Sequence, residues 1–460
     1  MTSLFARRIV PACVLSAAAV VALAAPGTSS AALLTKCGGS AIEAAGSSLQ
    51  GVAQDQVWNP DFNKSKVAGA CSGKQGTGAS PKVTYKNTSS GKGFAAWDEK
   101  LEYGALGFIG TDNTVNQTEK EELEAEGTSE GPASTVLTIP VAQSAEAIVV
   151  NLPEGCTGNS KVTGRLALSQ KALEGIYSGS VTKWSQITED GDELVQVVGG
   201  PTCNKEASIT PVVRKDPSGT THIFKRFLNW SDTGLLKTKS GEKTWNELSE
   251  LPNSTLWPET ITPAEGEKNS GLLKKVAETP SSIGYAVLAE ARELGFAPEG
   301  GGAGKQKFWV ELENTSKKGK ATYSDPSANG DAKELSNSNC KKTVYTNGKA
   351  SFPPPSVKST WNEVTTEQFS KTYALCGLTY DLALSNAAKY KVHGTTQGQA
   401  TTVENYLQYV VEKKGGQNYL QYVVEKKGGQ KEIANHDYLA LPSNVLTRAQ
   451  EAPGLITWEE

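Results

Sequence analysis

Hydrophobic and polar positions along the chain follow two different periods. Apolar, β-branched runs at 147–152 (AIVVNL) and 208–215 (SITPVVRK) predict buried strands, because such residues pack well in a sheet. Residues 170–177 carry apolar side chains on one helical face, and Ser169 before them is a favourable N-cap. A second helix is predicted within 218–228, where a Ser-Gly-Thr loop opens into a helical pattern. Strands that alternate with helices are typical of an α/β fold with mainly parallel pairing.

The start of the chain has the pattern of an export signal. Arg7 and Arg8 precede a short apolar run at 14–25, and small residues follow up to Ala31. The run is shorter than a membrane-spanning helix and has the flanks of a secretory signal peptide. We therefore predict a signal peptide at 1–31 and an exported mature protein, which is periplasmic, extracellular or held at the cell surface.

Length, charge and histidine content exclude several classes of protein. The chain has 460 residues, which predicts two or three domains. With 46 basic and 49 acidic residues, its net charge of −3 argues against a nucleic-acid binder, which would carry a basic face. It has three histidines and no CxxC spacing, so we expect no metal site and no cofactor. No cluster of catalytic residues stands out, and we predict a protein that is not an enzyme.

Six cysteines remain after the predicted signal peptide, namely Cys37, Cys71, Cys156, Cys203, Cys340 and Cys376. An even number in an exported chain predicts disulfide bonds, although six cysteines allow 15 pairings. Sequential pairing is the simplest arrangement. Each such bond would stabilise the fold by about 3–4 kcal/mol, because it restricts the unfolded chain.

Two segments have the character of additions to a fold. Residues 314–356 are rich in Ser, Asn, Lys and Gly and predict a polar surface insertion. The sequence NYLQYVVEKKGGQ occupies 405–417 and again 418–430. In one straight helix the second copy would lie about 140° out of phase with the first. We interpret the repeat as a tandem duplication of which one copy docks on the fold.

Four separate segments place glycine and hydroxyl residues at predicted strand-to-helix turns. They are AAGSSLQ (44–50), NTSSGKG (87–93), GFIGTDN (107–113) and RKDPSGTT (214–221). Such turns expose the first backbone N–H groups of a helix, and the positive end of the helix dipole favours an anion there. Serine and threonine hydroxyls add donors without bulk. The four segments together therefore predict an anion site that also contains one arginine and one aspartate.

In this order along the chain, the four segments resemble the ligand-binding loops of the periplasmic phosphate-binding proteins of bacterial phosphate ABC transporters. The likeness runs from about Ala44 to Pro442. It implies a two-lobed α/β fold of the type II periplasmic binding proteins, in which each lobe is a mainly parallel sheet flanked by helices. The ligand cleft would lie between the lobes. We expect lobe 1 at 32–138 plus 376–460 and lobe 2 at 139–375.

Carried over position by position, the resemblance implies a ligand set of hydroxyl and backbone donors, one carboxylate and one guanidinium. The set is Ser48, Leu49, Ser89, Asp112, Arg214, Ser218, Gly219 and Thr220. Leu49 would donate its backbone N–H, Asp112 would accept a hydrogen bond, and Arg214 would be oriented by Asp216. Lys92 stands where the family commonly has glycine. It is expected to face solvent, with contact to the anion as the alternative.

The aspartate in this set determines the expected specificity. A carboxylate beside an anion is repulsive unless the anion brings a proton to share. Phosphate near neutral pH still carries a proton, whereas sulfate does not, so Asp112 would reject sulfate. The resemblance implies a monomeric protein that captures inorganic phosphate and delivers it to the membrane permease of an ABC transporter.

Other functions stay open from the sequence. Within the binding class, the ligand could instead be another protonated oxyanion or a phosphorylated small molecule. A secreted phosphatase would need a nucleophile or metal ligands. GTSEG at 127–131 matches the GxSxG pattern around Ser129, but it follows an acidic stretch and not a buried strand. A surface interaction protein that kept the fold but lost its ligand is the remaining alternative.

Overall fold

The computed structural model describes residues 39–63, 82–97, 106–115, 120–121, 124, 134–160, 165–187, 195–298, 306–314, 322–328, 338–349, 351–355, 361–367, 372–389, 396–411 and 429–458. The predicted signal peptide, Cys37, Cys71 and Ser129 lie outside these residues. So do positions 412–428, which include most of the second repeat copy.

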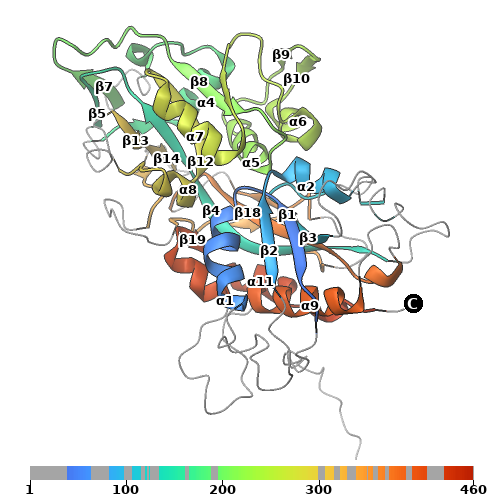
Figure 1. Cartoon of the computed structure of the whole chain (residues 1–460). Helices are drawn as coiled ribbons and strands as arrows, with labels where there is room; N and C mark the ends of the chain where they lie inside the picture. Colours follow the sequence, from blue (N-terminus) through green and yellow to red (C-terminus); the bar gives the residue numbers. More distant parts are fainter. Residues whose placement is uncertain are drawn as a thin grey trace, which may run out of the picture. The chain divides into compact units, whose positions relative to one another are not determined.

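A ten-stranded mixed sheet runs through the described structure (Figure 1). Its order is β11-β8-β12-β4-β18-β3-β1-β2, and β13 and β19 also pair with β4. The bounds are β1 Ile42–Gly46, β2 Val83–Asn87, β3 Leu106–Thr111, β4 Val136–Asn151, β8 Thr210–Arg214, β11 Ala264–Gly266, β12 Ser282–Val287, β13 Lys307–Trp309, β18 Cys376–Leu384 and β19 Tyr438–Leu439.

Parallel pairing occupies both ends of this sheet. β2, β1 and β3 are parallel at one end, and β11, β8 and β12 are parallel at the other. The long strands β4 and β18 between them are antiparallel to each other and to their neighbours. The predicted α/β fold with two mainly parallel halves is therefore confirmed, and two central strands connect the halves.

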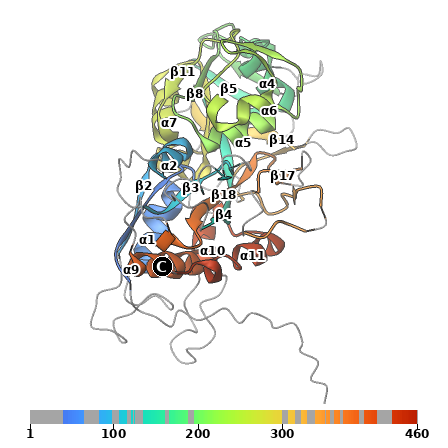
Figure 2. The same ribbon diagram turned by 90° about the vertical axis from the view of Figure 1, so that its right-hand side faces the viewer.

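Helices cover the sheet, and shorter strands lie outside it (Figure 2). The helices are α1 Asn59–Asn63, α2 Ser90–Trp97, α4 Gln170–Ser178, α5 Gly219–Leu228, α6 Trp245–Ser249, α7 Lys268–Glu278, α8 Leu288–Glu293, α9 Gln397–Val411, α10 Gly429–Glu432 and α11 Ser443–Ala449. A π-helix spans Ala53–Trp58, and 3-10 turns span Trp184–Gln186, Leu251–Asn253, Ala387–Lys389, Ile433–Asn435 and Pro453–Leu455. Three pairs of short strands lie outside this sheet: β5 Cys156–Ser160 with β7 Val195–Gly199, β9 Leu236–Thr238 with β10 Gly241–Lys243, and β16 Tyr345–Thr346 with β17 Thr365–Thr366. A three-stranded sheet has β14 Glu311–Glu313 between β6 Ala167–Leu168 and β15 Tyr323–Ser324.

Local sequence signals position the helix ends as expected. Ser169 caps α4 by accepting a hydrogen bond from the Ala172 N–H, and Ser218 caps α5 by accepting one from the Thr221 N–H. Each cap satisfies a backbone donor that the helix itself leaves unpaired. The predicted helices after Ser169 and Ser218 are therefore confirmed.

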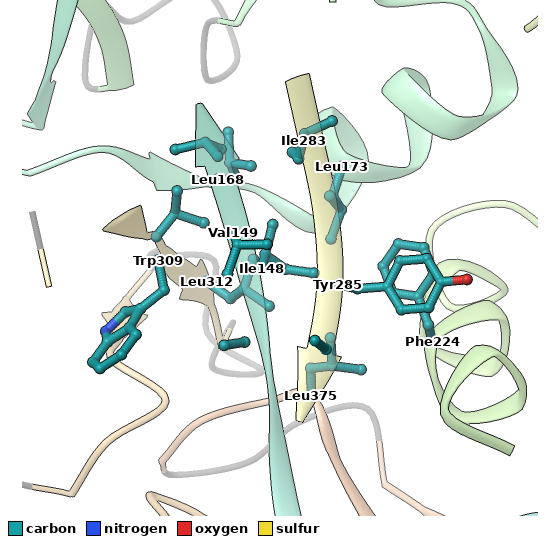
Figure 3. Close-up of a cluster of buried hydrophobic side chains, with 14 of the residues drawn as sticks. Ile148, Val149, Leu168, Leu173, Phe224, Ile283, Tyr285, Trp309, Leu312 and Leu375 are labelled. Atoms are coloured by element: carbon teal, nitrogen blue, oxygen red, sulfur yellow. The ribbon is translucent and has the colours of Figure 1, made fainter. Parts of the chain in front are cut away.

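Two large hydrophobic cores share the paired strands β4 and β18, each core taking a different part of each strand. One contains Ile148, Tyr285 and Trp309 and is shown in Figure 3. The other contains Ile139, Tyr406 and Val410. On β4 the change from one core to the other falls between Ala142 and Ala145, and on β18 it falls between Cys376 and Leu378. The lobe limits expected from the sequence, at 138/139 and 375/376, remain predictions, because the division of the core is a different property from a lobe boundary.

The segment predicted as a polar surface insertion is only partly polar and exposed. Tyr345 and Phe352 within it are buried and belong to the same core as β1. The Phe352 ring stacks on Trp361, with ring centroids 5.8 Å apart, and Trp361 in turn contacts Tyr380 of β18. The composition of 314–356 concealed these anchors, because a few aromatic residues suffice to fasten a polar segment.

Two disulfide bonds follow the predicted sequential pairing. Cys156 is bonded to Cys203, and Cys340 to Cys376. The second bond fastens the 314–356 segment to the first residue of β18, and both of its cysteines are buried.

Removing that bond should weaken the fold. We expect the double variant Cys340→Ser/Cys376→Ser to lose about 3–4 kcal/mol in free energy of unfolding, because the bond closes a loop with a separation of 36 residues. Urea denaturation checks this value. The Cys156→Ser/Cys203→Ser variant, with a separation of 47 residues, should lose a similar amount. A loss near zero for Cys340→Ser/Cys376→Ser would contradict the prediction.

No helix in the described part of the chain is both long and apolar enough to cross a membrane.

Candidate anion-binding site

The four hydroxyl-rich segments meet at the ends of the parallel strands. The first follows β1, the second joins β2 to α2, the third follows β3, and the fourth joins β8 to α5. Figures 1 and 2 both show α2 beside α5. The Ser90 Oγ at the start of α2 accepts hydrogen bonds from the backbone N–H groups of Asp112 and Gly219. Segments more than a hundred residues apart are thus joined directly.

Asp112 lies at the centre of this group and is almost completely buried. Its Oδ1 accepts hydrogen bonds from Ser47 Oγ at 2.5 Å and Thr379 Oγ1 at 2.7 Å. Its Oδ2 is buried and has no hydrogen-bond partner among the described residues. Burial raises the pKa of Asp112 to about 6. The hydroxyls of Ser47 and Thr379, the Arg214 charge and the nearby Thr220 hydroxyl oppose that rise. One oxygen is therefore anchored, and the other is left for a ligand that donates a proton.

Arg214, the last residue of β8, is buried and only partly satisfied by the protein. Its Nε donates to Asp216 Oδ1 at 2.9 Å, its Nη2 donates to Asp216 Oδ2, and its Nη1 donates to Asn269 Oδ1 at 3.3 Å. Three of the five guanidinium N–H groups are engaged, which leaves one on each Nη. Asp216 thus orients Arg214 as predicted, and a forked pair of donors remains for an oxyanion.

The start of α5 faces Asp112 at close range. A Cβ on Gly219 would stand 2.6 Å from Ser90 Oγ and 2.7 Å from Asp112 Cβ, so a larger residue cannot fit without displacing either. The hydroxyl of the next residue, Thr220, is buried without a hydrogen-bond partner in the described structure. The positive end of the α5 dipole and this hydroxyl both favour an anion.

The predicted ligand residues lie in these four loops, but they differ in what they can offer. Ser48 Oγ is buried and, like Thr220 Oγ1, lacks a hydrogen-bond partner within the described ranges. The Ser89 Oγ accepts from the Lys92 N–H and retains its own proton to donate. The Leu49 N–H, predicted as a free donor, instead donates to Ser47 Oγ at 3.0 Å. The Gly219 N–H is likewise engaged by Ser90.

Sequence reasoning missed several residues that shape this site. Ser47 and Thr379 anchor Asp112, and Ser90 joins the second loop to α5. The Tyr285 hydroxyl accepts from the Arg214 N–H and contacts Thr221 Oγ1 at 2.8 Å. Ser47 and Ser90 lie within the quoted motifs and could have been included. Thr379 and Tyr285 come from distant strands with no motif of their own.

The Lys92 side chain forms an ion pair outside the predicted ligand set. Its Nζ forms an ion pair with Glu267 Oε1 at 2.5 Å, and both side chains are about half exposed. Lys92 lies in the first turn of α2, and Glu267 directly precedes α7, so this pair joins the two helices. An exposed pair of this kind contributes little stability.

Glu146 is a further buried acid near the site. It lies on β4, is fully buried, and neither carboxylate oxygen has a hydrogen-bond partner in the described structure. Burial, aided by the charge of Asp112, raises the pKa of Glu146 well above its usual value, while Arg214 opposes the rise. The folded protein therefore holds this proton to a higher pH than the unfolded chain does.

This difference predicts a pH effect on stability. The stability contributed by protonated Glu146 is present below the unfolded pKa of about 4.5 and is lost as pH rises toward the folded pKa. In the ligand-free protein, we expect Glu146→Gln to remove a decline of up to about 1.4 kcal/mol per pH unit. Urea unfolding between about pH 5 and pH 8 measures the decline. The exposed Glu451→Gln is the control, and parallel pH curves for Glu146→Gln and the unsubstituted protein would contradict this assignment.

No group of three or more His, Cys, Asp or Glu side chains is arranged to hold a metal ion in the described part of the chain. The four loops bring together serine and threonine hydroxyls, the Asp112 carboxylate, the Arg214–Asp216 pair and the start of α5.

Comparisons with known proteins agree with this fold. The profile of the PBP superfamily domain matches residues 40–346. Phosphate-binding protein PstS of Pasteurella multocida is 26% identical over 233 residues, which cover 51% of this chain and 53% of that protein. Alkaline phosphatase L of Pseudomonas aeruginosa is 30% identical over 132 residues, which cover 28% of each chain. The alignments thus span about half of the first relative and less than a third of the second.

A solved phosphate-binding protein from Stenotrophomonas maltophilia shares the fold, with a TM-score of 0.57, 18% sequence identity and coverage of 90% of this chain and 93% of that one. At this identity the likeness concerns the fold, which is the two-lobe type II arrangement expected from the sequence. Because the superfamily profile matches well over half of its residues, the chain belongs to the PBP superfamily, as its resemblance to the phosphate-binding proteins predicts.

Proposed function

We propose that the chain binds inorganic phosphate between its two lobes. The observation that carries the proposal is the buried Oδ2 of Asp112, which has no hydrogen-bond partner among the described residues. The same site contains two Nη–H groups of Arg214 that no described residue accepts. A ligand that satisfies both must carry negative charge and at least one proton. Hydrogen phosphate has both properties. The unpartnered hydroxyls of Ser48 and Thr220 would donate to its remaining oxygens, together with Ser89 and Ser218.

Sulfate fits this arrangement poorly. It has the same shape and charge as hydrogen phosphate but no proton near neutral pH, so it would bring an acceptor against Asp112 Oδ2. Burying two acceptors against each other costs several kcal/mol in a site without water. Arsenate, which keeps a proton, should bind as phosphate does. Another protonated oxyanion is the alternative ligand within this class.

Delivery to a transporter is the cellular role that we infer from this activity. Phosphate-binding proteins named PstS are among the relatives, and the start of the chain has the pattern of a signal peptide. The proposed mature protein is an exported monomer that closes its lobes on phosphate and passes it to the permease of an ABC transporter. Closure would be driven by contacts that both lobes make with the ligand.

A phosphatase is the second class to test, because one relative is named alkaline phosphatase L. Ester hydrolysis needs an activated nucleophile or a metal-bound water. The site pairs no serine hydroxyl with a histidine among the described residues, and no metal-ligand cluster is described there. We therefore propose binding without catalysis, and expect no release of phosphate from p-nitrophenyl phosphate.

Calorimetry of the mature chain tests the proposal. The protein is unfolded and refolded to remove bound ligand, then titrated with phosphate and with sulfate near neutral pH. We expect one-to-one binding of phosphate and no response to sulfate. Silence toward phosphate in a folded protein would overturn the proposed ligand while leaving the fold unchanged.

A further inference from the structure

A chain of hydrogen bonds leads through the buried core to Asp112. It begins at Tyr406 of α9, whose hydroxyl donates to Gln54 Oε1 at 2.6 Å. The Gln54 Nε2 donates to Gln50 Oε1 at 2.7 Å, and the Gln50 Nε2 donates to Thr379 Oγ1 at 3.1 Å. The Thr379 hydroxyl in turn donates to Asp112 Oδ1 at 2.7 Å. All five side chains are buried, so these bonds are sheltered from competing water, and every donor points toward Asp112.

The Gln50 amide is held in one orientation within this chain. Its Nε2 also donates to the Tyr380 carbonyl oxygen at 3.1 Å, and its Oε1 accepts from Gln54. Turning the amide over would place its oxygen against the Tyr380 carbonyl, and two acceptors cannot share a hydrogen bond. Gly110 leaves the space that the amide needs, because a Cβ there would stand 2.5 Å from Gln50 Nε2. Gln50 therefore presents a donor to Thr379.

A second, shorter chain reaches the same oxygen of Asp112. The Leu49 N–H donates to Ser47 Oγ at 3.0 Å, and Ser47 Oγ donates to Asp112 Oδ1 at 2.5 Å. Each hydroxyl on Oδ1 thus accepts a hydrogen bond from an N–H group, which polarises it and makes it a stronger donor. The backbone N–H expected to bind the ligand instead strengthens one of the two hydroxyls that hold Asp112.

The Thr379 hydroxyl has a choice between two acceptors. The Thr111 carbonyl oxygen lies 3.2 Å from Thr379 Oγ1, farther than Asp112 Oδ1. The hydroxyl has a single proton, and a polarised donor gains most from a charged acceptor. Donation from Gln50 therefore favours the bond to Asp112 over the bond to Thr111.

We propose that Gln50 is a positioning residue that determines the anion specificity of the site, because it holds Asp112 in its ionised, proton-accepting form. The inference rests on the proposed function and names a residue outside the expected ligand set that sets the selectivity. Two donors on Oδ1 stabilise the carboxylate relative to the carboxylic acid. An ionised Asp112 needs a proton from the ligand, which hydrogen phosphate supplies and sulfate does not.

Without the Gln50 amide, Asp112 can carry a proton of its own. Thr379 can then turn its hydroxyl to the Thr111 carbonyl oxygen, and Asp112 Oδ1 loses one of its two donors. A carboxylate with fewer donors binds a proton more tightly. With that proton on Oδ2, Asp112 donates to sulfate instead of repelling it.

Calorimetry of the refolded mature chain tests this inference with Gln50→Met, because methionine keeps the length of the side chain without its amide. Each protein is titrated near neutral pH with phosphate, with sulfate, and with phosphate in the presence of sulfate. Two buffers of different ionisation enthalpy report the protons taken up on binding. We expect the preference for phosphate to fall about tenfold or more. Sulfate should bind Gln50→Met with uptake of about one proton. A merely structural role would change no proton count.

Gln143→Met is the matched control. Gln143 is likewise buried, accepts from the Tyr345 hydroxyl and donates to the Ala440 carbonyl oxygen, but it belongs to neither chain. Its replacement should lower the melting temperature and leave the preference for phosphate unchanged.

Two further variants separate Gln50 from its neighbours. Asp381 lies close enough to Gln50 for the amide to oppose the rise of the Asp381 pKa caused by burial. Asp381→Asn should leave the preference unchanged, because Asp381 donates nothing to Asp112. Should Gln50→Met fail to fold, Gln54→Met takes its place. It removes the amide that holds Gln50 and should shift the preference in the same direction.

Two results would overturn the role of Gln50 while phosphate binding stands. One is a preference in the folded Gln50→Met or Gln54→Met variant that matches the unsubstituted protein. The other is an equal fall in Gln143→Met. If the unsubstituted, folded protein does not bind phosphate, the proposed function itself is wrong.

Discussion

Replacing Arg214 by glutamine is expected to weaken phosphate binding by about 30- to 5,000-fold, or roughly 2–5 kcal/mol. Arg214 is buried, and three of its N–H groups are engaged by Asp216 and Asn269, so its remaining donors point where a ligand must bind. Glutamine keeps one amide donor but loses the charge and the fork. Calorimetric titration of the refolded variant with phosphate measures the loss.

Stability must be separated from binding in this variant. Asp216 is buried and pairs with Arg214, so removing the guanidinium leaves a buried carboxylate without its cation. This loss destabilises the fold. Arg165→Gln is the matched control, because it also removes ion pairs, with Asp325 at 2.7 Å and Glu311 at 3.4 Å, and none of these residues lies in the four loops. We expect Arg165→Gln to lower the melting temperature without changing phosphate affinity. Phosphate affinity in Arg214→Gln within threefold of the unsubstituted protein would contradict the proposed site.

Asp112→Asn should abolish the discrimination between phosphate and sulfate. Ser47 and Thr379 both donate to Oδ1, so the asparagine oxygen can keep those two hydrogen bonds and present its amide to the ligand. The amide donates to sulfate, which the carboxylate repels. We expect sulfate to bind the variant, and the preference for phosphate to fall by two orders of magnitude or more, about 3 kcal/mol.

A second buried acid provides the control for this substitution. Asp381 lies on β18, is fully buried, and has its pKa raised by burial, as Asp112 does. It is not one of the predicted ligand residues, so Asp381→Asn should leave the preference for phosphate unchanged. Calorimetric titration of each variant with phosphate in the presence of sulfate measures the ratio of the two affinities. Continued rejection of sulfate by Asp112→Asn would show that proton sharing with Asp112 does not determine specificity.

Signals that act over a few residues were readable from the sequence. The caps at Ser169 and Ser218 predicted the starts of α4 and α5, because capping depends on a side chain and the backbone of the next turn. Apolar runs predicted β4 and β8 in the same way. Their limits were less certain: β4 begins at Val136, well before the apolar run at 147–152. The first half of β4 contains polar residues that are nevertheless buried. These residues are buried because β18 and β19 pair with this half of the strand, and the local sequence does not show that pairing.

The candidate site was also partly readable, since its motifs are short and contiguous. Glycine and hydroxyl residues at four turns indicated an anion site. The resemblance to the phosphate-binding proteins implied Asp216 as the partner that orients Arg214, and the two are hydrogen-bonded. The backbone donors were not readable. The Leu49 N–H is engaged by Ser47, a local contact that depends on how the loop after β1 bends.

The sequence by itself determined the α/β class, the capped helices and the four loops that hold the candidate ligand groups. It allowed 15 disulfide pairings, of which sequential pairing was the simplest. Only the tertiary structure decided which distant residues contact these loops: Thr379 on Asp112, Ser90 against Gly219, and Glu267 on Lys92. The reason is physical. Caps, strands and turns depend on interactions within a few residues. The contacts that anchor a carboxylate depend on strand order and on the antiparallel pairing of β4 with β18, which no local pattern encodes.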